Sequence, residues 1–329
     1  CQGEIYLGIV GPVRSGKSTF IKRFMDVAVL PYMEDAAQKT RAQDELPQSA
    51  GGRTITTTEP KFIPQEAVEL KLAGEVTIRV RLVDCVGFMV EGAAGHLEDG
   101  AERLVKTPWY DHEIPMRVAA EEGTRKVIRE HSTIGIVVTT DGSVTELARE
   151  DYAAAEARIV AELQDIGKPF LILLNTADPA GEAAQTLAAQ LREQYDAACL
   201  PVNCLELTEQ DILEILRSVL YEFPVTEACF RMPEWMDVLA PENETKQQLY
   251  ALLREQMPSL HRLRDARRAA QVLADSELLE AADVENVSVD TGAVCYVLTF
   301  PRALYYSIIS EQAGVSLRSD GRSEEHTSE

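Results

Sequence analysis

The sequence has few basic residues, no C-x-x-C pair and no long apolar run. Its 32 lysine and arginine residues are outnumbered by 54 aspartate and glutamate residues, which gives a net charge of −22. This balance argues against a nucleic-acid-binding surface and against simple electrostatic adsorption to an anionic membrane. No apolar stretch approaches the length of a membrane-spanning helix, and we find no secretory signal before the first expected strand.

The cysteines are scattered along the chain, at positions 1, 85, 199, 204, 229 and 295. This pattern is more typical of reduced thiols in a cytoplasm than of a disulfide framework or a zinc site. Because the first residue is not methionine, we expect the N-terminus to be incomplete. Residues 319–329 end in a polar stretch without periodicity, which we interpret as a disordered or non-native tail.

The most informative stretch is a phosphate-binding loop near the N-terminus. Residues 5–10 form a short apolar run that predicts a buried strand, and Gly11-x-x-x-x-Gly16-Lys17-Ser18 follows without a gap. Helical spacing resumes directly after it. Lys17 is expected to reach the β- and γ-phosphates, and the Ser18 hydroxyl to bind Mg²⁺. A glycine-rich strand–helix turn that matches by chance is the alternative. The loop residues predicted to contact the nucleotide are Gly11, Arg14, Ser15, Gly16, Lys17, Ser18 and Thr19.

A long segment without a convincing regular element, residues 31–60, comes next. It ends in two glycines and a cluster of hydroxyls that includes Thr57 and Thr58. In phosphate-loop NTPases the segment at this place closes over the γ-phosphate and supplies a threonine hydroxyl to Mg²⁺. An edge strand is the other interpretation, because threonine favours strands.

An acidic motif follows a predicted hairpin of residues 68–72 and 76–84. The second strand ends in Asp84-Cys-Val-Gly87, where Asp84 is expected to hold Mg²⁺ through water and the Gly87 N–H to sense the γ-phosphate. The next residue is Phe88, at the place where Ras-type GTPases carry a water-orienting glutamine. Because a phenyl ring cannot orient water, Thr57 and Thr58 are the candidates for that role.

The remaining pattern predicts an α/β fold. Apolar strands alternate with amphipathic helices, which indicates a P-loop NTPase domain over residues 1–224 with a doubly wound, mostly parallel sheet. We predict a second, smaller α+β domain over residues 225–318, with helices over 243–256 and 259–282 and a small hairpin after them. Within the first domain we expect strands at 134–138, 169–174 and 200–204, and helices at 119–131, 152–166, 182–195 and 211–220.

A base-binding motif is expected after the strand at 169–174. GTPases carry Asn-Lys-x-Asp there, in which the aspartate reads guanine and the lysine packs on the base. This chain has Asn175-Thr-Ala-Asp178, so it keeps Asn175 and Asp178 but lacks the lysine. The residues therefore leave guanine and adenine both open, and an ordinary polar turn is a further interpretation.

With these motifs assembled, the chain resembles the stage IV sporulation protein A family, the spore-coat morphogenetic ATPases of endospore-forming bacteria. The resemblance is dense to about residue 265 and looser to about 318. It rests on GPVRSGKSTFIK (11–22), RAQDELPQSA (41–50), TTEPKF (57–62), RLVDCVG (81–87), TPWY (107–110), EHSTIG (130–135), TTDG (139–142), LYEFP (220–224) and RLRD (262–265).

The resemblance implies an enzyme that binds and hydrolyses ATP with Mg²⁺. In the family the phosphate-loop lysine matches Lys17, the Mg²⁺-linked aspartate matches Asp84, and the sensor threonines match Thr57 and Thr58. Ser18, Thr58 and Asp84 would then be the residues at the metal, and choice of ATP agrees with the missing lysine after Asn175.

The resemblance also implies partners and a location. Hydrolysis would drive self-assembly into the basement layer of the spore coat, in the mother-cell cytoplasm at the outer forespore membrane. The implied partners are further copies of the chain, a small amphipathic peptide (stage V sporulation protein M) that marks the membrane, and coat proteins, with indirect membrane contact and no nucleic acid. Family members are longer, so we expect this sequence to stop before their C-terminal region.

Two other functions compete with an assembly ATPase. A regulatory GTPase would use the same motifs as a reversible switch without polymerisation. A small-molecule phosphotransferase would also need an acceptor-binding base or a lid, and no such motif stands out.

The motifs predict that two substitutions separate binding from hydrolysis. Lys17→Ala should abolish nucleotide binding, because it removes the cation that contacts the phosphates. Thr58→Ala should chiefly slow hydrolysis while binding persists. Titration with a fluorescent nucleotide and a phosphate-release assay measure the two effects, and equal losses of binding in both variants would contradict these roles.

Overall fold

The structure is a computed structural model that describes residues 4–33, 36–47, 60–71, 77–90, 97–98, 101–289 and 291–313. It divides into two compact units, the first ending at Glu222 and the second beginning at Phe223. Thr57, Thr58 and the predicted tail at 319–329 lie outside the described residues.

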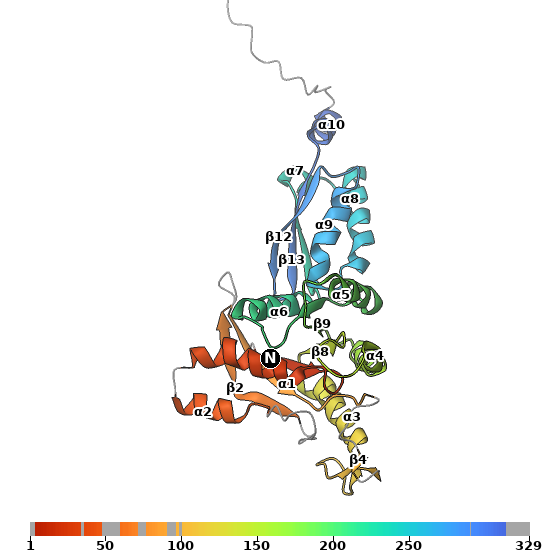
Figure 1. Cartoon of the computed structure of the whole chain (residues 1–329). Helices are drawn as coiled ribbons and strands as arrows, with labels where there is room; N and C mark the ends of the chain where they lie inside the picture. The colour runs from red at the N-terminus through yellow and green to blue at the C-terminus, as the bar shows by residue number, and fades with distance from the viewer. Residues whose placement is uncertain are drawn as a thin grey trace, which may run out of the picture. The chain divides into compact units, whose positions relative to one another are not determined.

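A six-stranded sheet forms the centre of the first unit, with strand order β10-β9-β8-β1-β3-β2. Its strands β2, β8 and β9 are labelled in Figure 1. Each neighbouring pair is parallel except β2 and β3, which are antiparallel. All residues of β8 and β9 are buried, as expected for central strands with continuous apolar sequences. The predicted α/β fold with a mostly parallel sheet is confirmed. The strands are β1 (Glu4–Val10), β2 (Lys61–Lys71), β3 (Thr77–Asp84), β8 (Ile134–Thr140), β9 (Phe170–Asn175) and β10 (Cys199–Val202).

Helices connect the parallel strands. α1 continues into a π-helical turn at Met25–Val29 and a 3-10 turn at Leu30–Tyr32, and α3 continues into a π-helical turn at Val127–His131. Two small two-stranded ladders lie in the chain before α3: β4 (Leu97–Glu98) with β5 (Ala101–Glu102), and β6 (Leu104–Val105) with β7 (Ile114–Pro115). The helices of this unit are α1 (Lys17–Phe24), α2 (Ala36–Asp44), α3 (Met116–Lys126), α4 (Arg149–Asp165), α5 (Glu182–Tyr195) and α6 (Glu209–Tyr221).

The prediction that residues 31–60 lack regular structure is wrong for α2. This helix has almost no apolar period, so the pattern gave no signal, although its alanines favour a helix. β2 also begins earlier than predicted, at Lys61 instead of residue 68. Pro64 interrupts the strand pattern, and the pairing with β3 shifts register between Ile63 and Val68. An edge strand tolerates proline at such an irregularity.

The second unit contains a three-stranded sheet with order β11-β13-β12. Figure 1 shows α9 beside β12 and β13, with α8 next to α9. In the described parts of both units, no helix combines the length and the apolar character needed to cross a membrane. The elements are β11 (Glu227–Arg231), α7 (Glu234–Asp237), α8 (Glu244–Gln256), a 3-10 turn (Met257–Ser259), a second 3-10 turn (Leu263–Asp265), α9 (Ala266–Ala274), β12 (Ala281–Ser288), β13 (Ala293–Thr299) and α10 (Arg302–Ala313).

The predicted helix over 259–282 is wrong. α9 covers only its middle, and β12 begins at Ala281. The Asp265 carboxylate accepts hydrogen bonds from the backbone N–H groups of His261 and Arg262, which holds the chain in a turn before α9. Apolar residues on both sides of these turns continue a helical pattern, so periodicity alone did not reveal the breaks.

The expectation of reduced cysteines is wrong for one pair. Cys229 of β11 and Cys295 of β13 form a disulfide. They are 66 residues apart in the sequence, but the parallel register of the two strands places them opposite each other. Sequence spacing carries no information about this register, so the pair could not be predicted.

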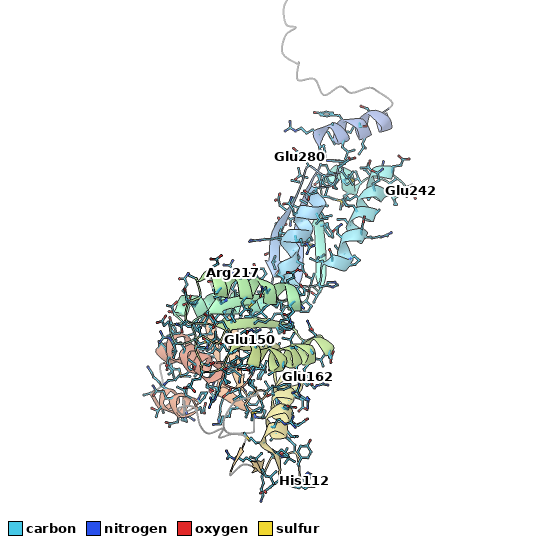
Figure 2. All side chains as sticks on the ribbon, turned by 45° about the vertical axis from the view of Figure 1, so that its right-hand side comes forward. His112, Glu150, Glu162, Arg217, Glu242 and Glu280 are labelled. Carbon is cyan, nitrogen blue, oxygen red and sulfur yellow. A yellow bond between two sulfur atoms is a disulfide. The ribbon has the colours of Figure 1, made fainter. Side chains whose placement is uncertain are left out.

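A buried ion pair joins α4 to the sheet. The Glu156 carboxylate, 1% exposed, accepts hydrogen bonds from Arg149 Nη1 at 2.6 Å and Nη2 at 2.8 Å. The hydroxyls of Thr139 on β8 and Tyr195 on α5 donate to the same carboxylate, at 2.5 and 3.0 Å. A second carboxylate of α4, Glu162 (labelled in Figure 2), accepts hydrogen bonds from Arg125 and Arg129 nearer the surface, both at 2.9 Å.

Removal of Glu156 should therefore destabilise the first unit strongly. Glu156→Ala leaves the Arg149 charge and two hydroxyls without their acceptor, so we expect a loss of about 3–5 kcal/mol in the free energy of unfolding. The matched control is Arg129→Ala, which removes a half-exposed ion pair and should cost less than about 1 kcal/mol. Urea denaturation measures both, and similar losses would contradict the assignment.

Candidate functional site

The loop between β1 and α1 curls tightly because neighbouring strands approach its backbone. Gly16, directly before α1, has φ +105°, and a Cβ at this position would collide with the Asn175 amide at the end of β9. A Cβ at Gly11 would collide with the carbonyl oxygen of Val138 on β8. Arg14 also has a positive φ, +66°. Glycine is thus required at both ends of the loop, where the main chain approaches two strands.

Lys17 begins α1 and is folded over this loop. Its side chain is 5% exposed, and Nζ donates hydrogen bonds to the carbonyl oxygens of Gly11, at 3.2 Å, and Pro12, at 2.7 Å. Burial lowers the pKa of Lys17, while the nearby Cys85 and Asp84 oppose that change. The ammonium group is therefore held at the carboxyl end of β1, as the motif predicts for a phosphate contact.

Asp84 lies next to this lysine. It ends β3, opposite Ile9 of β1 in the parallel register. Burial raises the pKa of Asp84 to about 6, and the Lys17 charge opposes this shift. Its Oδ1 atom is buried and has no hydrogen-bond partner.

An unpartnered carboxylate oxygen fits a site for Mg²⁺ or for one of its water ligands. The part of the chain that the structure describes contains no group of three or more histidine, cysteine, aspartate or glutamate residues that could hold a metal alone. Among the described residues, Asp84 and Ser18 are the ones that would hold Mg²⁺. Ser18 lies with Thr19 in the first turn of α1, and both residues are half-buried.

Gly87 completes the group around Lys17. Its φ is +96°, and a Cβ there would collide with the Gly11 carbonyl oxygen and lie 2.5 Å from Lys17 Nζ. The Gly87 N–H donates a hydrogen bond to Thr124 Oγ1 of α3, at 3.1 Å. The structure thus brings Lys17, Asp84 and Gly87 together. Thr124 was missed, because a single threonine within a helix belongs to no motif.

Phe88 points into the core and away from solvent. Its side chain is fully buried, and its carbonyl oxygen accepts a hydrogen bond from the Val13 N–H at 2.8 Å. The guanidinium groups of Arg158 and Arg125 lie 4.8 and 5.9 Å from the ring centroid. The residue at the glutamine position is therefore structural. The predicted water-orienting role of Thr57 and Thr58 stays a prediction, since both lie outside the described residues.

Asn175 links the phosphate loop to the strands that precede the base motif. Its Nδ2 donates to the carbonyl oxygen of Ser15 at 3.1 Å, and its Oδ1 accepts from the Cys204 N–H at 3.1 Å. Ser15 is fully buried, and its hydroxyl oxygen has no hydrogen-bond partner. In the structure Asn175 therefore fixes the backbone of the loop, and its predicted contact with the nucleotide stays a prediction.

Thr176 occupies the place of the GTPase lysine and joins two loops. Its hydroxyl donates to Asp141 Oδ2 at 2.6 Å, and the Ser143 hydroxyl donates to Asp141 Oδ1 at 2.6 Å. Burial raises the pKa of Asp141, but these hydrogen bonds outweigh it and hold the pKa below its ordinary value. The Ala177 N–H donates to Ser143 Oγ at 2.9 Å, and Asp178 at the end of the motif is exposed.

Asp141 and Ser143 were not predicted as site residues. A usable signal existed, because they follow one buried parallel strand, β8, and Thr176 follows the adjacent one, β9. Loops at the carboxyl ends of neighbouring parallel strands converge on the same edge of a sheet, where α/β folds bind their ligands.

Comparison with known families matches both parts of the chain. Residues 1–224 match the model for the ATPase domain of stage IV sporulation protein A, and residues 225–324 match the model for the middle domain of the same protein. The stage IV sporulation protein A of Clostridioides difficile (strain 630) is 43% identical over 319 residues, which is 97% of this chain and 65% of that protein.

Two Bacillus relatives give the same picture. The stage IV sporulation protein A of Bacillus subtilis (strain 168) and that of Bacillus anthracis are each 43% identical over 316 residues, or 96% of this chain. The chain spans 64% of the length of both relatives.

The crowding at Gly87 predicts a defect that a second glycine does not share. Gly87→Ala would push the Lys17 ammonium out of place, so we expect the affinity for nucleotide to fall at least about tenfold. Gly167 also has a positive φ, +63°, but no atom lies within 4 Å of a Cβ built there. Gly167→Ala should therefore lower stability by about 1–2 kcal/mol and leave affinity unchanged. Titration with fluorescent ATP tests this pair, and equal affinities would contradict it.

Proposed function

The chain belongs to the stage IV sporulation protein A family, and on this premise we propose that it binds ATP with Mg²⁺ and hydrolyses it to drive its own assembly. One observation carries the nucleotide part of the proposal. The Lys17 ammonium, the unpartnered Asp84 oxygen and the Gly87 turn meet beside a loop whose backbone is bent by glycine.

Each of these groups has a distinct task in phosphoryl transfer. The amides of the 11–16 loop and the N-terminus of α1 bind phosphate oxygens, and Lys17 donates to the β- and γ-phosphates. Asp84 and Ser18 hold Mg²⁺, which when bound neutralises charge that develops on the phosphate oxygens. The Gly87 N–H, which donates to Thr124 Oγ1 in the structure, would exchange that partner for the γ-phosphate when nucleotide binds. Thr57 or Thr58 orients the attacking water, because Phe88 is buried in the core.

The base loop favours adenine over guanine in this proposal. Thr176 donates its hydroxyl to Asp141 and has no long side chain to cover the base, as the GTPase lysine does. Asp178 is exposed at the end of the loop and would contact the base without that support. Asn175 holds the phosphate loop in register with this motif.

The assembly part of the proposal rests on the family resemblance. We propose that the shape change drives copies of the chain into the basement layer of the spore coat, in the mother-cell cytoplasm at the outer forespore membrane. A small amphipathic peptide, stage V sporulation protein M, and coat proteins are the proposed partners, with indirect membrane contact.

We also infer that the predicted P-loop domain is doubly wound, that it ends near residue 224, and that a middle domain follows to about residue 318.

Affinity and sedimentation measured on one sample test this proposal. The protein should bind ATP with Mg²⁺ more tightly than GTP, and it should sediment after turnover of ATP but not after incubation with GTP. Lys17→Ala is the matched control and should neither bind nor sediment. Preference for GTP without sedimentation would instead favour a regulatory GTPase. If Lys17→Ala sediments as much as the wild type, assembly does not depend on nucleotide, and this part of the proposal is wrong.

A further inference from the structure

The second unit contains a thiol pair that the proposed ATPase chemistry does not use. Cys229 on β11 and Cys295 on β13 are partners in a parallel register, with their Cα atoms 4.6 Å apart, and they form a disulfide. Side chains opposite each other in a parallel pair lie on the same face of the sheet. The fold of the second unit therefore brings the two sulfur atoms together without any loop movement.

The pair lies on the more open face of this sheet. Val294, Tyr296 and Leu298 of β13 are at most 1% exposed and form the packed face. Because side chains alternate along a strand, Cys295 lies on the opposite face, and both cysteines are partly exposed. A small thiol can attack a disulfide only where it can reach a sulfur atom, and this face allows such an approach.

The other cysteines that the structure describes are in a different environment. Cys85, Cys199 and Cys204 have free thiols, and at most 7% of each residue is exposed. Buried thiols of this kind are inert toward exchange. Thiol–disulfide chemistry in the described part of the chain is thus confined to one pair.

Strand β11 is held in place by contacts other than the disulfide. The Val225 N–H donates to the His261 carbonyl oxygen at 3.0 Å, and the Thr226 N–H donates to the Gly292 carbonyl oxygen at 2.9 Å. The Phe230 ring stacks on the Tyr296 ring, with centroids 5.2 Å apart. None of these contacts involves a sulfur atom, so they do not require the disulfide to be closed.

We propose that Cys229 and Cys295 form a reversible redox site that exchanges with low-molecular-weight thiols and their disulfides. In reduction, a small thiolate attacks one sulfur atom, the protein S–S bond breaks, and the other cysteine leaves as a thiolate and takes up a proton. A second small thiolate then attacks the small-molecule sulfur of the mixed disulfide and forms a small-molecule disulfide. The second cysteine leaves as a thiolate and takes up a proton, so that two electrons have passed to the protein. Oxidation is the reverse. The oxidised site fastens the edge strand β11 to the central strand β13.

Equilibration of the whole chain in glutathione buffers tests the proposal. The native protein is incubated over a series of ratios of reduced to oxidised glutathione, quenched with an alkylating reagent, digested, and measured by mass spectrometry. We expect a disulfide-linked peptide pair containing Cys229 and Cys295 in oxidising buffers. As the reduced share rises, it should convert in one reversible transition into two alkylated peptides.

Two variants sharpen the test. Cys229→Ser leaves Cys295 without its partner, so we expect a mixed disulfide with glutathione at Cys295 in oxidising buffers. Cys199→Ser changes a buried thiol and should leave the transition of the pair unchanged. Alkylation of both cysteines at every ratio, or a link that opens only in denaturant, would overturn the proposal. None of these readouts depends on nucleotide, so failure here is distinguishable from failure of the proposed ATPase function.

Discussion

The site is built around a buried ammonium group. Lys17 Nζ donates to the main-chain carbonyl oxygens of Gly11 and Pro12, which partly compensate its buried charge. Gly87 has no side chain because one would collide with the lysine, and Asp84 supplies the opposite charge. A buried cation requires such compensation, because its desolvation is otherwise costly. The glycine-bent loop at residues 11–16 and the Gly87 turn are therefore parts of one arrangement.

Hydrogen bonds from β8 and β9 connect the Lys17 site to the predicted base-binding motif at residues 175–178. Asn175 fixes the phosphate loop from β9, and Thr176 ties the end of β9 to Asp141 at the end of β8. Farther inside, Glu156 joins β8, α4 and α5 through Arg149, Thr139 and Tyr195. Asn175, Thr176 and Glu156 each have hydrogen-bond partners on a neighbouring element, and a buried network of this kind helps to specify one geometry. The phosphate and base loops are thus held by neighbouring strands of the same sheet.

Much of the first unit could be predicted because its signals are local. Apolar runs predicted β1, β8 and β9, and the Gly-x-x-x-x-Gly-Lys motif predicted that Lys17 lies between a strand and a helix. What could not be predicted depends on long-range register or on residues without a pattern. Thr124 reaches Gly87 only because α3 packs beside the turn, and Cys229 meets Cys295 only through strand pairing. α2 was missed because its exposed sequence has no apolar period.

The burial of Phe88 means that this position cannot supply a residue that orients water. A glutamine at this position would place an amide beneath two guanidinium groups, in a space shaped for a ring, where no water reaches it. One substitution at this position therefore cannot restore the glutamine-based arrangement of Ras-type enzymes; the packing of α3 and α4 would have to change with it. A group that positions the attacking water would therefore have to come from another part of the chain.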